Sequence, residues 1–382
     1  MAEPSRTIPY GRQTIDSDDV AAVTEALTTD FLTTGPGVEQ FERALLEVAE
    51  AQYAVAVSSG TAALHAAYAA AGVGSDDELV TSPLTFASTA NVAVQLRAKV
   101  VFADVEPATG LLDPQATASA VSRRTRAVVP IDYAGVPADH AAFQPLRERG
   151  IAVISDSSHS IGARRSGRPI GKWADAATVS FHAVKAITTG EGGVVFTDRK
   201  DWADAMRRFR HHGIERFGSH ALADEGPWAY SMVELGLNYR ITDFQCALGG
   251  SQLKKLERFL GVRRAIAKQY SSLLADVEGI MLPPEVAEVE SAWHLYVVRV
   301  RDASRRRPFF EKLRGLGVGV QVHYLPVYWH PFYQELGYKR GLCPNAEDYY
   351  RRAVSLPIFP TMTPDTTEWV VEQVRLAARD VL

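Results

Sequence analysis

Two ionisable side chains stand directly after apolar runs of the sequence, where strands of a buried sheet are expected to end. Asp156 follows the run 152–154, and Lys185 follows the run 177–181. An aspartate at the rim of a buried strand is unfavourable without a partner, although it is also a common helix cap. A lysine among apolar residues loses hydration, which lowers its pKa and makes its amine a nucleophile that can form an imine. A lone lysine is, however, most often a solvated surface residue.

A third feature could hold a phosphate group. The residues Ser59-Gly60-Thr61 follow the apolar run 53–57 and open an alanine-rich stretch. Free backbone N–H groups at a helix N-terminus bind phosphate together with Ser and Thr hydroxyls, and an ordinary capped helix is the alternative interpretation. The glycine-rich stretch 190–193 matches neither GxxxxGK[ST] nor GxGxxG, which disfavours a nucleoside-triphosphate loop and a dinucleotide fold.

Together these three features fit one cofactor, pyridoxal 5'-phosphate. This cofactor needs a phosphate cradle, a lysine that forms its imine, and an acid that keeps its pyridine nitrogen protonated. A charge-assisted hydrogen bond from the ring nitrogen to Asp156 is worth on the order of 1.5–3 kcal/mol. The cofactor would also supply the cation that a buried Asp156 requires.

The elements that must position these residues alternate between short apolar runs and helical stretches. This alternation predicts an α/β fold with a mainly parallel seven-stranded sheet covered by helices on both faces. Ligands of such sheets sit at the carboxyl ends of the strands, where Asp156 and Lys185 are expected. The predicted strands are 53–57, 78–80, 99–102, 127–131, 152–154, 177–181 and 193–196.

Helical patterns precede this sheet, and a smaller α+β unit follows it. Asp16 caps a predicted helix with Val20, Val23 and Leu27 on one apolar face, and 38–48 repeats the pattern. We therefore expect a large cofactor-binding domain over 1–250 and a small C-terminal domain over 251–382. In the small domain, the pattern predicts helices at 252–274 and 308–314, strands at 293–300 and 318–322, and a last helix capped by Thr363.

Composition limits the class of protein. The 382 residues are 46% hydrophobic and 23% charged, and 41 basic against 45 acidic residues give a net charge of −4. The hydrophobic fraction excludes a disordered chain. The small negative net charge does not favour binding to nucleic acid or to an anionic membrane. Cys246 and Cys343 cannot form a disulfide framework, and no apolar run approaches the ~20 residues that span a bilayer. Without an apolar secretory segment in 1–14, we expect a cytoplasmic enzyme with no nucleic-acid or membrane partner.

The motifs run in the order of a known family. Over nearly the whole chain they resemble the DegT/DnrJ/EryC1/StrS sugar aminotransferases, which belong to fold-type I of the pyridoxal phosphate enzymes. The motifs are Thr33-Thr34-Gly35-Pro36, Ser59-Gly60-Thr61-Ala62-Ala63-Leu64, Thr85-Phe86, Asp156-Ser157-Ser158-His159-Ser160-Ile161-Gly162, Ser180-Phe181-His182-Ala183-Val184-Lys185, Gly190-Glu191-Gly192-Gly193 and Gly236-Leu237-Asn238-Tyr239-Arg240.

This resemblance implies a role for each motif. Lys185 would form the imine and move protons, and Asp156 would pair with the ring nitrogen. His159 would lie near the phenolic oxygen of the cofactor, and Phe86 would stack on its ring. Because the family completes its phosphate site with an asparagine from the partner subunit, the resemblance also implies a homodimer with shared active sites. The implied phosphate ligands are Gly60, Thr61, Ser180 and Asn238.

The sequence departs from the family pattern at three small residues. Ala183 replaces a proline that is common before the Val-Lys pair, and Ser157 and Ser158 stand where alanines are common. Such small residues in a tight turn are not expected to change the chemistry. Family members with histidine in place of the lysine are dehydratases, so Lys185 favours amino transfer.

One branch of the family is more similar than the others. The opening 8–13 and the aromatic stretch 323–338 resemble enzymes that aminate UDP-4-keto-6-deoxy-N-acetylhexosamines at C-4 on the way to pseudaminic acid. Glutamate is the amino donor there, which implies ping-pong kinetics through Lys185. Plain packing is the alternative explanation of the aromatic stretch. The implied substrate-binding residues are Thr33, Thr34, His323 and Tyr324.

A basic run before the Asn238 motif could bind the diphosphate of such a substrate, although a solvated helix face explains most of it. The spacing of the three histidines in this region does not fit zinc, so no metal site is predicted. The run comprises Arg207, Arg208, Arg210, His211, His212 and Arg216, and the third histidine is His220.

Other functions stay open on the sequence alone. The substrate could be a dTDP-linked or a 3-keto sugar. The chain could bind the cofactor or a nucleotide sugar without turnover, but the presence of Lys185 counts against this. A fold-type I desulfurase would need a mobile cysteine, whereas Cys246 stands in a helical pattern.

Overall fold

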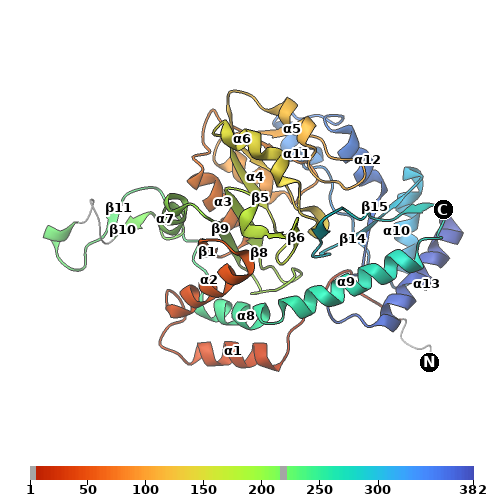
Figure 1. The fold of residues 1–382 in the computed structure, drawn as a ribbon, viewed down its shortest axis with the longest axis horizontal. Helices are drawn as coiled ribbons and strands as arrows, with labels where there is room; N and C mark the ends of the chain where they lie inside the picture. Colours follow the sequence, from red (N-terminus) through yellow and green to blue (C-terminus); the bar gives the residue numbers. More distant parts are fainter. Residues whose placement is uncertain (1–5, 216–221) are drawn as a thin grey trace.

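The computed structural model describes residues 6–215 and 222–382, and its centre is a seven-stranded sheet (Figure 1). The strand order is β1-β9-β8-β5-β4-β2-β3. Only β9 runs antiparallel to its neighbours, so the prediction of a mainly parallel sheet of seven strands is confirmed. The strands are β1 (Tyr53–Val57), β2 (Glu78–Thr81), β3 (Lys99–Phe102), β4 (Thr125–Val129), β5 (Ala152–Asp156), β8 (Ala176–Ser180) and β9 (Gly193–Thr197).

Side chains alternate between two apolar cores because successive residues of a strand point to opposite faces. Val55 and Val57 of β1 belong to one core, and Ala54 and Ala56 belong to the other. Helices therefore cover both faces of the sheet, as the sequence predicts. The first core includes α3 (Gly60–Ala70), α4 (Ser88–Gln95) and α7 (Lys200–Phe209), and the second includes α2 (Pro36–Ala49), α8 (Asp243–Leu253) and α9 (Leu256–Leu273).

The first helix begins where the sequence predicts, but its predicted apolar face is wrong. Asp16 caps α1 (Ser17–Leu27) and accepts hydrogen bonds from two backbone N–H groups of its first turn. Val20 and Leu27 are 59% and 54% exposed, whereas Asp19 is buried. The reason is that α8 presents Ser251 and Gln252, which donate hydrogen bonds of 2.7 Å to the Asp19 carboxylate. The helix is therefore held to the protein by polar contacts.

The C-terminal part forms a second sheet with its own apolar core. Its strand order is β12-β14-β15, and α9, α10 and α13 pack against it. Thr363 caps the last helix, as predicted, and accepts from the backbone N–H of Thr366. The predicted domain boundary at residue 250 lies within α8 and stays a prediction. The elements are β12 (Ile280–Met281), β14 (Tyr296–Val300), β15 (Ala353–Leu356), α10 (Arg306–Gly315) and α13 (Pro364–Val381).

The predicted strand 318–322 is absent among the described residues, which show only isolated bridges there. Val318 bridges Ile8, and Gln321 bridges Ser355. The N-terminal segment lies so close that a Cβ on Gly319 would stand 2.7 Å from the Ile8 carbonyl oxygen. The stretch is therefore shared between two partners, and neither pairing continues long enough to form a strand.

The remaining elements are short and connect these layers. In Figure 1 the hairpin of β10 and β11 projects away from the body of the protein. Within the described residues, no helix is long and apolar enough to cross a membrane. These elements are α5 (Pro114–Ala120), α6 (Gln144–Glu148), α11 (Pro331–Glu335), α12 (Pro344–Arg352), β6 (Arg164–Arg165), β7 (Arg168–Pro169), β10 (Ile214–Glu215), β11 (Ser231–Met232) and β13 (Val289–Glu290).

Candidate active site

A cavity of 450 Å³ opens at the carboxyl ends of β1, β5 and β8. Its walls come from the turn after β1, the end of β5, the loop after β8 and segments far along the chain. Strand ends of an open α/β sheet are the usual place for a ligand. The residues predicted from the sequence that line this cavity are Gly60, Thr61, Phe86, Asp156, His159, Ser180, Lys185, His323 and Tyr324.

Lys185 reaches the cavity from the loop between β8 and β9. The loop is fixed because the Lys185 backbone N–H donates to the His182 carbonyl at 2.9 Å, and Thr188 and Thr189 both donate to the Phe181 carbonyl. Burial lowers the pKa of Lys185 to about 8, although the nearby Asp156 opposes this shift. At pH 7 about a tenth of the side chain is then a neutral amine, far more than for a solvated lysine.

Asp156 ends β5 and is 6% exposed. The Thr89 hydroxyl donates to its Oδ2 at 2.7 Å, and the Ser158 backbone N–H donates to its Oδ1 at 3.2 Å. Among the described residues, no cationic side chain forms an ion pair with this carboxylate. It lines the cavity with unused capacity to accept a hydrogen bond, which fits a protonated ring nitrogen. Thr89 was not predicted, because a threonine inside a helix has no sequence signal for this contact.

The turn between β1 and α3 forms a cradle that fits a phosphate. Ser59 caps α3 and accepts from the Ala62 N–H at 3.1 Å, while the helix begins at Gly60. A Cβ on Gly60 would stand 2.8 Å from the Cβ of Ser180, so only glycine allows this close approach. The cavity is therefore lined by the first turn of α3, which includes Thr61, and by the end of β8.

Phe86 presents a flat apolar surface to the cavity. Its side chain is 64% exposed although it lines the cavity wall, and its ring lies 6.4 Å from that of Tyr324. Covering this ring with a ligand would remove apolar surface from water and so favour binding. A planar heteroaromatic ring in the cavity would cover it by stacking.

Three histidines surround Lys185, of which the sequence predicted two. The rings of His159 and His294 lie 4.3 Å apart, and the Tyr324 hydroxyl lies 3.2 Å from His159 Nε2. Burial, followed by the charge of Lys185, lowers the pKa of His159 well below its ordinary value and that of His323 to about 4. These imidazoles are therefore neutral at pH 7 and act through hydrogen bonds.

His294 and Tyr10 also line the cavity, although neither was predicted as a site residue. His294 stands at the start of the predicted strand 293–300, where a single polar residue was a possible signal, and it lines the cavity. Tyr10 lies in the opening segment and packs 5.7 Å from the His323 ring. Neither position could be placed at the site without the tertiary contacts that bring it there.

Three predicted site residues do not line this cavity. Thr33 bridges Thr242 at the start of α8, and Thr34 adjoins it in a left-handed conformation. Asn238 bridges His211 after α7. None of the three belongs to the walls of the cavity within the same chain. Their roles at the site stay predictions.

The basic run near Asn238 is engaged in ion pairs rather than turned to the cavity. Arg208 pairs with Glu215 and Glu234, and the mostly buried Arg210 pairs with Glu42. This arrangement favours the structural interpretation of the run over diphosphate binding. Arg216 and His220 lie outside the described residues.

Residues 13–375 match the DegT/DnrJ/EryC1/StrS aminotransferase family. This chain belongs to that family. Enzymes of the DegT/DnrJ/EryC1/StrS family use pyridoxal 5'-phosphate, so the protein is a sugar aminotransferase with this cofactor.

Individual relatives match over almost their full length. The spore coat polysaccharide biosynthesis protein SpsC of Bacillus subtilis (strain 168) is 37% identical over 374 residues, which cover 96% of both chains. Helicobacter pylori PseC, an aminotransferase involved in the biosynthesis of pseudoaminic acid, has 29% identity and a TM-score of 0.92 over 98% of this chain and 100% of its own. The PLP-form of Spr1654 from Streptococcus pneumoniae has 25% identity and a TM-score of 0.92 over the same shares.

The side chains that line the cavity match the chemical groups of the cofactor. One cavity brings four features together with Lys185. They are the buried carboxylate of Asp156, the exposed ring of Phe86, the N-terminus of α3 at Gly60, and Ser180. A phosphorylated, protonated pyridine ring offers a partner to each of these groups.

Proposed function

We propose that this protein transfers the amino group of L-glutamate to C-4 of a UDP-linked 4-keto-6-deoxy-N-acetylhexosamine. The observation that carries the proposal is the placement of Lys185 and Asp156 in one cavity with the neutral aromatic residues of the C-terminal segment. The stretch 323–338 resembles the branch with this substrate, and the similarity to PseC supports it. A cytoplasmic location stays a prediction.

In this proposal Lys185 moves the proton in both half-reactions. Its neutral amine takes the proton from the α-carbon of glutamate and later delivers a proton to C-4 of the sugar. The bound cofactor delocalises the electron pair left at the carbon that loses its proton. Asp156 keeps the ring nitrogen protonated, and Gly60 with Ser180 orients the phosphate. The two half-reactions share one site, which gives ping-pong kinetics.

The sugar would contact neutral polar groups rather than charges. His323 has a pKa of about 4, and burial raises the pKa of Tyr324 above its ordinary value, so both are uncharged at neutral pH. Such groups hydrogen-bond to hydroxyl and carbonyl oxygens, and their rings pack against the apolar face of a hexose. This chemistry suits the sugar half of the substrate.

A substrate screen tests this proposal. Purified enzyme should aminate a UDP-4-keto-6-deoxy-N-acetylhexosamine with glutamate, and mass spectrometry would detect the amino sugar with 2-oxoglutarate as co-product. The matched comparisons are the dTDP-linked 4-keto sugar and a 3-keto isomer. If the enzyme aminates only the dTDP-linked sugar or only the 3-keto isomer, that compound replaces the proposed substrate. If it aminates no keto sugar, the protein is better explained as a binding protein.

We also propose a homodimer in which each subunit completes its partner's site. Thr33, Thr34 and Asn238 lie away from the cavity of their own chain. The segment 222–235, which includes β11, exposes large apolar side chains that a monomer would not favour. They are Trp228 (78% exposed), Tyr230 (55%), Met232 (67%) and Leu235 (82%).

Charges placed on this segment should break the dimer. Sedimentation equilibrium should give twice the 41.8-kDa chain mass for the wild type. The variant Trp228→Asp/Leu235→Asp should have the mass of one chain and should lose activity. The reason is that each buried apolar side chain contributes about 1.5–3 kcal/mol. Leu336→Asp, at an equally apolar position that is 49% exposed, is the control and should stay dimeric. A fully active monomer would contradict the shared site.

A further inference from the structure

A second buried carboxylate lies directly behind the cofactor-binding turn. Asp132 follows β4 and is 0% exposed. Its backbone N–H donates to the Asp156 carbonyl at 3.0 Å, and the Asp156 N–H donates to the Pro130 carbonyl at 2.9 Å. Asp132 does not line the cavity. It therefore adjoins Asp156 on the neighbouring strand end without reaching any ligand.

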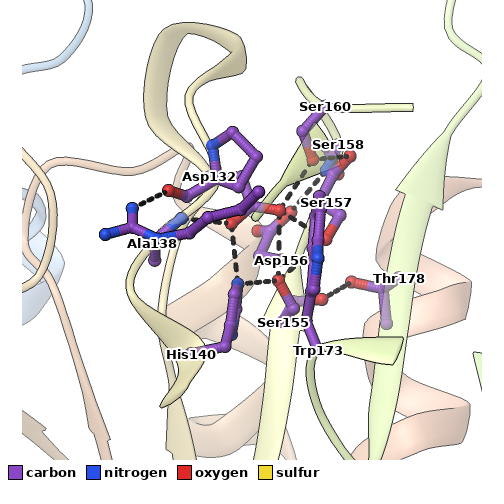
Figure 2. Close-up of polar contacts among 12 residues, drawn as sticks. Asp132, Ala138, His140, Ser155, Asp156, Ser157, Ser158, Ser160, Trp173 and Thr178 are labelled. Carbon is purple, nitrogen blue, oxygen red and sulfur yellow. Dashed lines mark hydrogen bonds and ion pairs between the residues drawn. The ribbon is translucent and has the colours of Figure 1, made fainter. Parts of the chain in front are cut away.

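Five hydrogen-bond donors surround this carboxylate, as Figure 2 shows. Its Oδ1 accepts from the Ala138 N–H at 2.9 Å and lies 3.0 Å from His140 Nε2. Its Oδ2 accepts from the hydroxyls of Ser157 at 2.7 Å, Ser160 at 2.6 Å and Ser155 at 3.2 Å. An ionised carboxylate has about four acceptor positions, and all are used. Donors that converge on a carboxylate stabilise its ionised form, so the arrangement favours the anion.

The cluster keeps its negative charge despite the histidine. His140 is stacked on Trp173, and its Nδ1 has no hydrogen-bond partner among the described residues. Because a second ring N–H would be buried without an acceptor, His140 donates from Nε2 as a neutral imidazole. Burial raises the pKa of Asp132, whereas hydrogen bonds from His140, Ser160 and Ser157 are among the causes that lower it below its ordinary value.

The residues tied to Asp132 are those that carry the cofactor site. Ser157 and Ser160 flank His159 in the sequence, and the adjoining Ser158 N–H donates to the Asp156 carboxylate. The serine at 157, where the family resemblance leads one to expect alanine, thus has a specific partner. One carboxylate fixes both sides of the turn that holds Asp156 and His159.

We propose that Asp132 is a positioning residue of the cofactor site, which fixes the turn 155–160 and places a second negative charge behind Asp156. This charge favours a proton on the cofactor's ring nitrogen, because a nearby negative charge stabilises the positively charged form of the ring. The inference rests on the proposed role of Asp156. Other titratable groups interact with these two carboxylates. His140 contacts Asp132, and Asp156 interacts electrostatically with Lys185, Tyr68 and Tyr324.

Three variants separate the charge from simple structural support. Asp132→Asn keeps the shape and removes the charge, and Ser157→Ala keeps the charge and removes one donor. Thr178→Val is the matched control, because the buried Thr178 hydroxyl donates to the Ser155 carbonyl at 3.1 Å in the same segment without touching Asp132. All three are compared with wild type by melting temperature, by pyridoxal phosphate titration of cofactor-free protein, and by the pH midpoint of the bound cofactor's absorbance band.

The expected results differ for each variant. Asp132→Asn should weaken cofactor binding about tenfold and move the pH midpoint of the band about one unit lower, since loss of a negative charge releases the proton more easily. Ser157→Ala should weaken binding less and leave the midpoint in place. Thr178→Val should lower only the melting temperature.

Two results would overturn the proposal. One is a wild-type affinity and midpoint in folded Asp132→Asn, and the other is an equal change in Thr178→Val. If Asp132→Asn does not fold, Ser157→Ala/Ser160→Ala carries the test and must weaken cofactor binding more than Thr178→Val does. Failure of the wild type to bind the cofactor would instead contradict the site itself, so the two failures are distinguishable.

Discussion

Replacing Lys185 with alanine is expected to reduce amino transfer by about four orders of magnitude, the upper range for loss of a positioned acid–base group. The variant should still bind pyridoxal phosphate, because the carboxylate of Asp156, the ring of Phe86 and the cradle at Gly60 all remain. Product formation and the absorbance spectrum with and without glutamate would measure both properties. The wild-type band should change on addition of glutamate, and the variant should never form a protein-linked imine.

Lys172→Ala is the control for this experiment, because that lysine pairs with Asp198 at 2.9 Å and lies outside the cavity. It should keep wild-type activity. Retention of more than about one hundredth of the activity in Lys185→Ala would mean that another base moves the proton. The neighbouring His159 and His294 would then be the next candidates.

The pH dependence of the wild type tests the same lysine. Only the neutral amine attacks the cofactor's aldehyde, and the neutral fraction rises as pH increases through the pKa. Because burial lowers the pKa of Lys185 to about 8, the rate of imine formation in cofactor-free protein should rise with a midpoint near 8. A midpoint near the ordinary lysine value of about 10.4 would mean that water reaches the amine freely.

The main sheet and the centre of the site could be predicted because their signals are local. Each strand is a short apolar run, and Asp156 stands at the end of β5 while Lys185 lies in the loop that follows β8. A parallel sheet then brings the ends of β5 and β8 to the same edge. No knowledge of distant contacts is needed for this step.

The parts that could not be predicted depend on contacts between distant segments. The exposure of Val20 follows from the hydrogen bonds of Asp19 to α8, more than 200 positions away. His294 and Thr89 reach the site from other elements, and the sequence around each is that of an ordinary strand or helix. The role of Asp132 could not be predicted either, because only the structure shows that it accepts hydrogen bonds from hydroxyls after the next strand. Periodicity describes one element at a time and cannot find such pairs.

The second large effect is expected at Asp156. Asp156→Asn keeps the size of the side chain but replaces the carboxylate by a neutral amide, which cannot stabilise a protonated ring nitrogen. A hydrogen bond to a charged group is worth about 1.5–3 kcal/mol, so the rate of the glutamate half-reaction should fall about 100-fold. Stopped-flow absorbance of cofactor-loaded protein would measure it. Cofactor affinity should change less, since the phosphate cradle is untouched.

The control must cost stability without touching the cavity. Asp175→Asn meets this condition, because Asp175 accepts from Arg147 and from the Val153 N–H beside β5 but does not line the site. It should lower the melting temperature and leave the rate of the half-reaction within about twofold. If Asp156→Asn showed the same small change in rate, the ring nitrogen would not need its proton. Thr89 would then matter only as a structural partner of the carboxylate, and the charge behind it at Asp132 would have no catalytic consequence.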